Sequence, residues 1–548
     1  MENILKKYLS WRLAWLLSCF FATPAFPATG QVYNPSDVAV VNAIIEGNGL
    51  RWAKAPSDGS SVPADWEMRG LESAEYVSEM AIGVMWSTGK TNRRVIKLYV
   101  CNQDLTGRLD VSGLGELKNL DCFNNQLTEL NISGLKNLEK LSCSFNQLTE
   151  LDVARHNNLY ELSCGFNELT RLDVSELTAL THLSCFVNQL TELDVSRLTL
   201  LTGLFCSDNQ LTNLDVSRLD KLERISCGDN KLTELNFAVA AKLASIYCPR
   251  NQLTELNLSD FSSLYHLDYS SNQLTELHIS GCPQLEGLHC PFNQLTELDV
   301  ANCPVLLTVS CGSNQLTELN ISNCPTLSGI ECSINKLTEL DVSGFKNLNS
   351  LSCSSNQLTE LDVAGLSSLT FLICSSNQLT ELDLSGCAKL DEPDCNDQKP
   401  ILAMKWNGTT QQYDIPIALN NPTGLSKGFG YSGGKLMADN NSSDSTTFTV
   451  ETGLSGKTLS GVISLTYSTG SANERATVPH LKAVAGNGSI LVSGVSVGDY
   501  LRVYSISGKL VYMKKADSSD MRVDVERGIY IVASGKMAIK VQLGYGGD

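Results

Sequence analysis

LEKLSCSFNQLTELDV, residues 138–153, contains the pattern on which the architecture of this chain depends. Its spacing of Leu, Cys, Asn and Val returns every 21 residues, and a fixed period of this length is the signature of a repeat architecture. The repeated Asn marks thirteen copies in register: Asn125, Asn146, Asn167, Asn188, Asn209, Asn230, Asn251, Asn272, Asn293, Asn314, Asn335, Asn356 and Asn377. So many copies without a slip exclude chance.

The spacing predicts that each repeat is one coil of a right-handed solenoid. Leu, Val and Cys point inward and stack on the same residues of neighbouring coils, because no coil can bury its apolar side alone. We expect a short strand at Leu141–Cys143 in each coil, and the strands form a parallel sheet on the concave side. The repeated Asn is expected to bond backbone groups where the chain leaves the strand.

The repeat also explains nearly all of the 19 cysteines. Fourteen stand on one ladder, in which Tyr269 fills the missing rung: Cys101, Cys122, Cys143, Cys164, Cys185, Cys206, Cys227, Cys248, Cys290, Cys311, Cys332, Cys353, Cys374 and Cys395. Four more replace a Leu elsewhere in the repeat: Cys282, Cys303, Cys324 and Cys387. Neighbouring rungs point the same way about 4.8 Å apart, and a disulfide needs closer Cβ atoms. We therefore expect reduced, buried thiols and, without any Cys-x-x-Cys pair, no metal site.

This pattern is that of leucine-rich repeats with Cys in place of one Leu. Over about residues 101–395 the chain resembles internalin J-type surface proteins, and the cysteine ladder is the most specific mark of the resemblance. The resemblance implies a bacterial, adhesin-like protein that contacts host surfaces or other cells. The expected fold is an α/β-type leucine-rich-repeat solenoid, with short parallel strands and an irregular or 3-10 convex side, over residues 101–399 in about 14 coils.

Residues 1–28 are typical of a signal peptide. Basic residues precede an apolar run at Leu13–Ala22, and small residues follow near a cleavage region at Ala25–Ala28. The alternative is a lipobox at Leu16–Cys19, which would give a lipid-anchored Cys19. Either interpretation predicts export of the chain.

Residues 29–100 are expected to form an N-terminal cap over the first coil. Ser36 can cap a helix over Asp37–Ile45, and Trp52, Trp66 and Trp86 can cover exposed leucines. The alternative is a separate ligand pocket in this segment.

After the repeats, residues 400–480 alternate apolar and polar positions between turn residues, which predicts a small immunoglobulin-like β-sandwich that serves as spacer and end cap. Residues 481–548 read as further hairpin strands. Their Gly508–Val511 and Gly528–Val532 elements resemble the C-terminal sorting domain of the type IX secretion system of Bacteroidetes, over residues 481–543. Gly544–Asp548 extends past the usual ending. One or two small all-β sandwich domains are therefore expected after the repeats. For residues 481–548, the alternative is an ordinary β-domain without a sorting role.

Composition excludes several classes of function. The net charge of -18 argues against a nucleic-acid partner, because binding to nucleic acid requires a basic face. After the leader no stretch is apolar enough for a transmembrane segment. The chain has six histidines and no nucleophile elbow, metal-ligand motif or phosphate loop. We therefore expect no enzyme activity, no catalytic residues and no cofactor.

Ring-bearing residues flank the ladder on the predicted concave face, and exposed aromatic rows are common in binding surfaces. We predict ligand contact by Phe123, Phe145, Phe166, His182, Phe186, Phe205, Tyr247, His266, His289 and Phe292. Burial of the rings against neighbouring side chains is the alternative, and a change to Ser350–Ser355 in later coils favours the N-terminal half. A column of glutamates that includes Glu150 is expected to be a solvated acidic face, with calcium binding as its alternative.

The sequence therefore predicts an exported protein, attached to the cell surface or outer membrane or secreted. It would be a monomeric adhesin that binds a host or bacterial surface protein through its concave face and supports attachment, biofilm formation or virulence. One alternative is a glycan-binding protein whose rings stack on sugars, and another is an architectural component of a surface layer.

Overall fold

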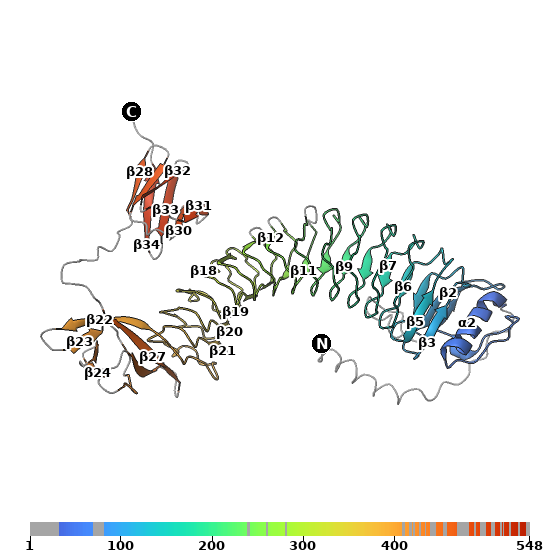
Figure 1. Cartoon of the computed structure of the whole chain (residues 1–548), viewed down its shortest axis with the longest axis horizontal. Coiled ribbons are helices and arrows are strands. Elements are labelled where there is room, and N and C mark those ends of the chain that lie inside the picture. Colours follow the sequence, from blue (N-terminus) through green and yellow to red (C-terminus); the bar gives the residue numbers. More distant parts are fainter. Residues whose placement is uncertain are drawn as a thin grey trace. The chain divides into compact units, whose positions relative to one another are not determined.

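A computed structural model describes residues 32–68, 82–237, 242–258, 261–279 and 282–407, together with segments between 412 and 543. The predicted signal peptide, with Cys19, and the extension Gly544–Asp548 lie outside the described residues. The chain divides into two compact units at residues 466 and 467. The first unit contains the repeats, and Figure 1 shows their coils stacked side by side.

Fifteen strands of the first unit form one sheet, and the repeat strands within it run parallel. In spatial order they are β1 (Ile82–Trp86), β2 (Val95–Val100), β4 (Asn119–Asp121), β6 (Lys140–Ser142), β7 (Glu161–Ser163), β8 (His182–Ser184), β9 (Gly203–Phe205), β10 (Arg224–Ser226), β11 (Ser245–Tyr247), β13 (His266–Asp268), β15 (Gly287–His289), β17 (Thr308–Ser310), β19 (Gly329–Glu331), β20 (Ser350–Ser352) and β21 (Phe371–Ile373).

Each repeat strand is three residues long, and its central residue is apolar and buried. Leu141 in β6 pairs in register with Leu120 on one side and Leu162 on the other, so a column of Leu runs through the coils. The strand begins one residue earlier than predicted, and Cys143 lies just beyond it, fully buried. The leucine-rich-repeat solenoid with short parallel strands is confirmed, with very little helix.

The return side of the coils carries separate, smaller sheets. They pair β3 (Thr106–Asp110) with β5 (Gln126–Asn131), β12 (Glu255–Asn257) with β14 (Glu276–His278), and β16 (Glu297–Asp299) with β18 (Glu318–Asn320). We call the outward side of the 15-stranded sheet the strand face, and the surface of the segments that follow each repeated Asn the return face. The two faces therefore belong to different sheets.

The repeated Asn holds successive coils together, as predicted. Asn146 donates from Nδ2 to the carbonyls of Cys143 and Cys122, at 3.0 Å each, and its Oδ1 accepts from the backbone N–H of Leu127 at 3.0 Å. In the last coil Gln398 stands at the Asn position and makes the same three kinds of bond. The ladder thus satisfies backbone groups that the short strands leave unpaired.

The N-terminal cap contains helix α2 (Pro35–Asn48), the short 3-10 helix η1 (Ala64–Trp66) and β1, which pairs antiparallel with β2. The helix is longer than expected, and its N-cap is Asn34 instead of Ser36. Asn34 Oδ1 accepts from the backbone N–H groups of Ser36 and Asp37 at 3.0 and 3.1 Å, and Pro35 supplies the favoured first residue.

All cysteines of the repeats are buried, but the prediction of thiols throughout is wrong at one pair. Cys227 and Cys248 form a disulfide with a Cα–Cα distance of 4.9 Å, while the other sixteen cysteines of the described chain are free. The prediction failed because the coil spacing lies within the Cα range that disulfides span, about 4.4–6.8 Å. A sulfur that turns toward its neighbour can therefore close the gap between two rungs.

Beyond the repeats, the first unit ends in one six-stranded sheet, which is joined to the last coil. In spatial order it contains β24 (Phe429–Ser432), β25 (Lys435–Ala438), β23 (Gln412–Ile415), β22 (Ile401–Asn407), β27 (Thr458–Tyr467) and β26 (Ser445–Glu451). Gln398 donates its backbone N–H to Ser460 at 2.9 Å and accepts from Val462 at 2.7 Å. Strand β27 therefore closes the open end of the solenoid.

The second unit holds two sheets. One is β28 (Lys482–Gly486), β29 (Ser489–Ser493) and β32 (Asp520–Asp524), and the other is β31 (Leu510–Lys515), β30 (Tyr500–Ser505), β33 (Gly528–Ser534) and β34 (Met537–Leu543). Buried Ile490, Val492, Leu501 and Val503 alternate with other residues along β29 and β30, as the sequence pattern predicts. The small all-β part of the predicted fold is present.

Candidate functional site: the strand face

The ten ring-bearing residues predicted to contact a ligand lie in neighbouring columns and do not form one stripe. His182 and His266 begin their strands, while Phe205, Tyr247 and His289 end theirs. Two more, Phe123 and Phe186, directly follow a ladder Cys. The remaining three, Phe145, Phe166 and Phe292, come one residue later and have left-handed backbones with φ between 52° and 58°.

The N-terminal phenylalanines pack on one another. Phe145 stacks on Phe166 with ring centroids 4.0 Å apart, and Phe123 and Phe186 extend the row edge-to-face at 5.2 Å. All four rings are half-buried. The structure therefore supports partial burial for this row, which leaves less ring surface for a ligand than the sequence alone suggested.

Glycines on the strand face make room for neighbouring rings. A Cβ added to Gly203 would lie 3.1 Å from both His182 and Phe205, and one added to Gly165 would lie 3.0 Å from the ring of Phe186. These distances are shorter than ordinary van der Waals contacts. The rings of His182 and Phe186 therefore lie over the bare backbone of an adjacent coil, and that of Phe205 lies over the glycine of its own strand.

Two histidines meet at the middle of the face. The ring centroids of His266 and His289 are 5.6 Å apart, and His266 lies over Gly287. Burial lowers the pKa of His266, and the neighbouring His289 lowers it further. Both effects disfavour the imidazolium form of His266, and the nearby Asp268 opposes them only in part.

The most exposed apolar side chains lie in the middle and C-terminal coils. Phe292 is 62% exposed, and it was among the predicted residues; Ile334, at 58%, stands two coils further on in the same left-handed column. The sequence prediction missed Ile334 together with four residues on or beside the strands: Tyr160, Tyr265, Leu307 and Phe371. A comparison of equivalent positions over all coils, with aliphatic residues included, would have found them.

Charge is arranged differently on the two faces. Glu150 and its equivalents occupy the return face, where all but the half-buried Glu318 are exposed. Asp152 and its equivalents accept from the backbone two residues later, as Asp194 does from the N–H of Ser196 at 3.0 Å. A shallow hollow of about 240 Å³ beside Asp194 is lined by Thr, Asn and carboxylate side chains. Within the described residues no group of three or more His, Cys, Asp or Glu is placed to hold a metal ion.

Comparisons with known proteins agree with this architecture. Residues 116–156 match the family model for leucine-rich repeats in two copies. The functional domain of InlJ from Listeria monocytogenes, whose structure includes a cysteine ladder, is 29% identical, with a TM-score of 0.55 over 69% of this chain and 93% of that one. No curated protein sequence matches.

Two further solved structures show lower similarity. YopM, a leucine-rich effector protein from Yersinia pestis, is 27% identical, with a TM-score of 0.44 over 52% of this chain and 84% of that one. An internalin, InlF, from Listeria monocytogenes is 24% identical, with a TM-score of 0.42 over 55% and 86%. The described part of the chain contains no helix that is long and apolar enough to cross a bilayer. The match to the leucine-rich-repeat family model and the similarity to InlJ identify the repeats as an internalin-like leucine-rich-repeat solenoid.

Proposed function

We propose that this internalin-like leucine-rich-repeat protein binds another protein through the strand face of its middle and C-terminal coils. The observation that supports this is a set of exposed apolar side chains in these coils. Tyr265 and Leu307 directly precede their strands, and Phe292 and Ile334 stand two residues after a ladder Cys. Exposed apolar patches of this kind mark interaction sites on soluble proteins. Tyr247 and the half-buried His266 and His289 lie in the strands of the same coils and supply polar groups on this face.

Backbone strain supports a binding role for two of these residues. Ile334 and Phe292 have φ of 57° and 58°, a region that costs energy for any side chain and most for a β-branched one. Most other coils place Asn, Asp or Ser at this position, which the left-handed region tolerates better, although Phe145, Phe166, Val187 and Arg250 also occupy it. An exposed Ile334 in a strained backbone conformation lowers the stability of the folded chain. Contact with a partner would account for its presence.

The acidic return face supports the choice of the strand face. The glutamate column faces solvent there, so much of the negative charge of the chain lies away from the strand face. The desolvation cost of burying charge is therefore smaller on the strand face. A partner of mixed polar and apolar surface, such as a folded protein, fits such a face.

The wider role we propose is that of an exported adhesin, held at the cell surface or secreted. The signal-peptide-like N-terminus and the sorting-domain-like C-terminus support export, and the likeness to InlJ supports adhesion. The chain acts as a monomer in this proposal. A host or bacterial surface protein is the proposed partner.

Site-directed photo-crosslinking tests the proposed face. A photoreactive phenylalanine analogue replaces Tyr265 or Phe292 in the full chain, and a control chain carries it at Glu276, an exposed residue of the return face. Each chain is mixed with surface-protein extracts from host and bacterial cells, and crosslinked products are identified by mass spectrometry.

The proposal expects a specific protein adduct from positions 265 and 292 and none from position 276. Equal products from all three positions would contradict the proposed face. Binding to a glycan array, without protein adducts, would favour the glycan alternative instead. A chain that neither crosslinks nor binds glycans would point to the architectural alternative.

A further inference from the structure

The cysteine ladder is interrupted at one rung by Tyr269, and the disulfide lies directly beside the interruption. Tyr269 is fully buried, and within the described residues its hydroxyl group has no hydrogen-bond partner. A buried, unpaired hydroxyl is unfavourable, whereas Cys fits the same position in the other rungs. The Tyr therefore has a cost for folding that calls for a compensating role.

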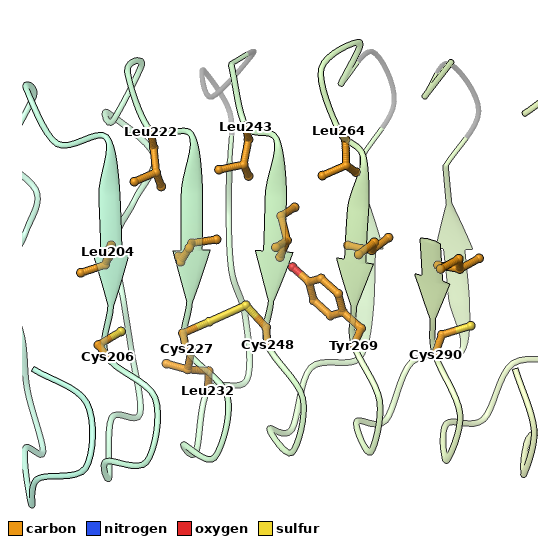
Figure 2. Packing of buried hydrophobic residues seen from close by; sticks show 14 of the residues in the cluster. Leu204, Cys206, Leu222, Cys227, Leu232, Leu243, Cys248, Leu264, Tyr269 and Cys290 are labelled. Carbon is orange, nitrogen blue, oxygen red and sulfur yellow. A yellow bond between two sulfur atoms is a disulfide. The ribbon is translucent and has the colours of Figure 1, made fainter. Parts of the chain in front are cut away.

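Figure 2 shows how this side chain affects its neighbours. The ring of Tyr269 leans from β13 toward β11 and occupies the space beside Cys248. The sulfur atoms of Cys206 and Cys290 point toward the following coil, but that of Cys248 points back toward Cys227. Cys227 and Cys248 thus face each other, with Cα atoms 4.9 Å apart.

We propose that the Tyr269 ring makes Cys227 and Cys248 the specific oxidation site of the ladder, by turning the Cys248 sulfur away from the following coil. Along a ladder of identical rungs each sulfur has two equivalent neighbours, so no pair is favoured over another. A ring that fills one side of Cys248 removes this equivalence. The replacement of one Cys by Tyr therefore selects one disulfide among many possible ones.

The chemistry requires an oxidant, which we take to be a small or protein disulfide. The thiolate of one cysteine attacks a sulfur of the oxidant and forms a mixed disulfide, and one thiol leaves. The thiolate of the second cysteine then attacks the mixed disulfide on the protein sulfur, which forms the Cys227–Cys248 bond and releases the second thiol. The two thiol protons go to solvent or to the released thiolates, and both electrons go to the oxidant.

The folded solenoid then keeps the bond in place. Migration along the ladder would require a thiolate at Cys206 to attack Cys227, but burial raises the pKa of the Cys206 thiol well above its ordinary value. The protonated thiol is a poor nucleophile. The bond therefore forms while the coils assemble, once the Tyr269 ring has packed beside Cys248, and burial keeps it at this pair after the coils have closed.

Peptide mapping of the full chain, folded with oxidised and reduced glutathione, tests the proposal. Free thiols are blocked in denaturant and the unreduced protein is digested with trypsin. Cleavage at Arg224, Lys231, Lys242 and Arg250 releases residues 225–231 and 243–250, each with one cysteine. The disulfide-linked pair of these two peptides is quantified against the blocked forms by mass spectrometry.

Two variants separate the ring from the rest of the rung. Tyr269→Phe keeps the ring, and Tyr269→Cys restores the residue that the other rungs contain and should fold. We expect the linked pair to dominate in the wild type and in Tyr269→Phe, and to fall to a minority in Tyr269→Cys. Absence of the pair in the wild type would overturn the proposal, and so would an unchanged amount in Tyr269→Cys or links spread evenly over the ladder.

Discussion

Single positions in the repeat differ in what they contribute, and Tyr269 is the clearest case. Its ring fills the core, but its hydroxyl is buried without a partner among the described residues. Tyr269→Phe should raise the free energy of unfolding by about 1 kcal/mol, because an unsatisfied buried polar group costs about 1–3 kcal/mol. Urea unfolding followed by circular dichroism measures the change, and exposed Tyr265→Phe serves as the control. A loss of stability in Tyr269→Phe would show that the hydroxyl has a partner after all.

Backbone strain at Ile334 leads to a second prediction at this scale. Ile334→Asn should stabilise the chain by about 1 kcal/mol, because a β-branched residue is poorly accommodated in the left-handed region and Asn is not. The same change should weaken partner binding if the proposed face is correct. Thermal unfolding and crosslinking yield measure the two effects. Ser355→Asn, at φ 54° in the next coil of the same column, is the matched control and should change both much less.

Burial of the thiols sets their reactivity. Burial raises the pKa of Cys185 to about 12, so the thiolate fraction of the folded protein is very small at pH 8 and rises only as the pH approaches that value. Cys185 should therefore resist alkylation by iodoacetamide at pH 8 and react rapidly after unfolding in guanidinium. Quantification of the tryptic peptide that contains Cys185, with and without denaturant, measures this. Rapid modification in the native state would mean that the ladder opens locally.

The element that joins one coil to the next is the Asn ladder. Asn230 donates to the carbonyls of Cys206 and Cys227 at 3.0 and 3.1 Å and accepts from Leu211 at 2.9 Å. Asn230→Ala should destabilise the chain by about 2–5 kcal/mol, since each buried backbone group left without a partner costs about 1–3 kcal/mol. The exposed Gln210→Ala, in the preceding coil, should change the urea midpoint very little. Equal effects of the two changes would contradict a structural role for the ladder.

At the scale of the whole molecule, stability depends on closing both ends of the stack. The described cap residues cover the first coil, and β27 bonds to the last coil through Gln398, Ser460 and Val462. A solenoid with an uncovered end exposes the apolar side of a coil that is buried by its neighbour elsewhere.

Two truncations test this closure. A chain that ends at residue 400 should lose hydrogen-exchange protection in its last coils, including Leu384 and Leu390. A chain that ends at residue 466, where the first compact unit ends, should keep the protection of the full chain. Hydrogen exchange read by mass spectrometry compares the two. Full protection after truncation at 400 would show that the six-stranded sheet is dispensable for the solenoid.

The sequence by itself determined the solenoid, its period, the inward Leu, Cys and Val columns and the role of the repeated Asn. A 21-residue spacing repeated in register admits one way of burying those side chains, so local pattern and global fold agree. It also predicted that the rings beside the ladder would lie on the strand side. The identity of a residue and its place in the period suffice for such conclusions.

Only the tertiary structure decided which of those rings are available and which sulfurs meet. Phe145 and Phe166 are partly covered because adjacent coils bring them within 4.0 Å, whereas Phe292 stays exposed in the same column. The Cys227–Cys248 bond depends on how Tyr269 fills the space between coils. Both outcomes arise from contacts between side chains of different coils, and periodicity, which makes every coil equivalent, contains no information about such differences.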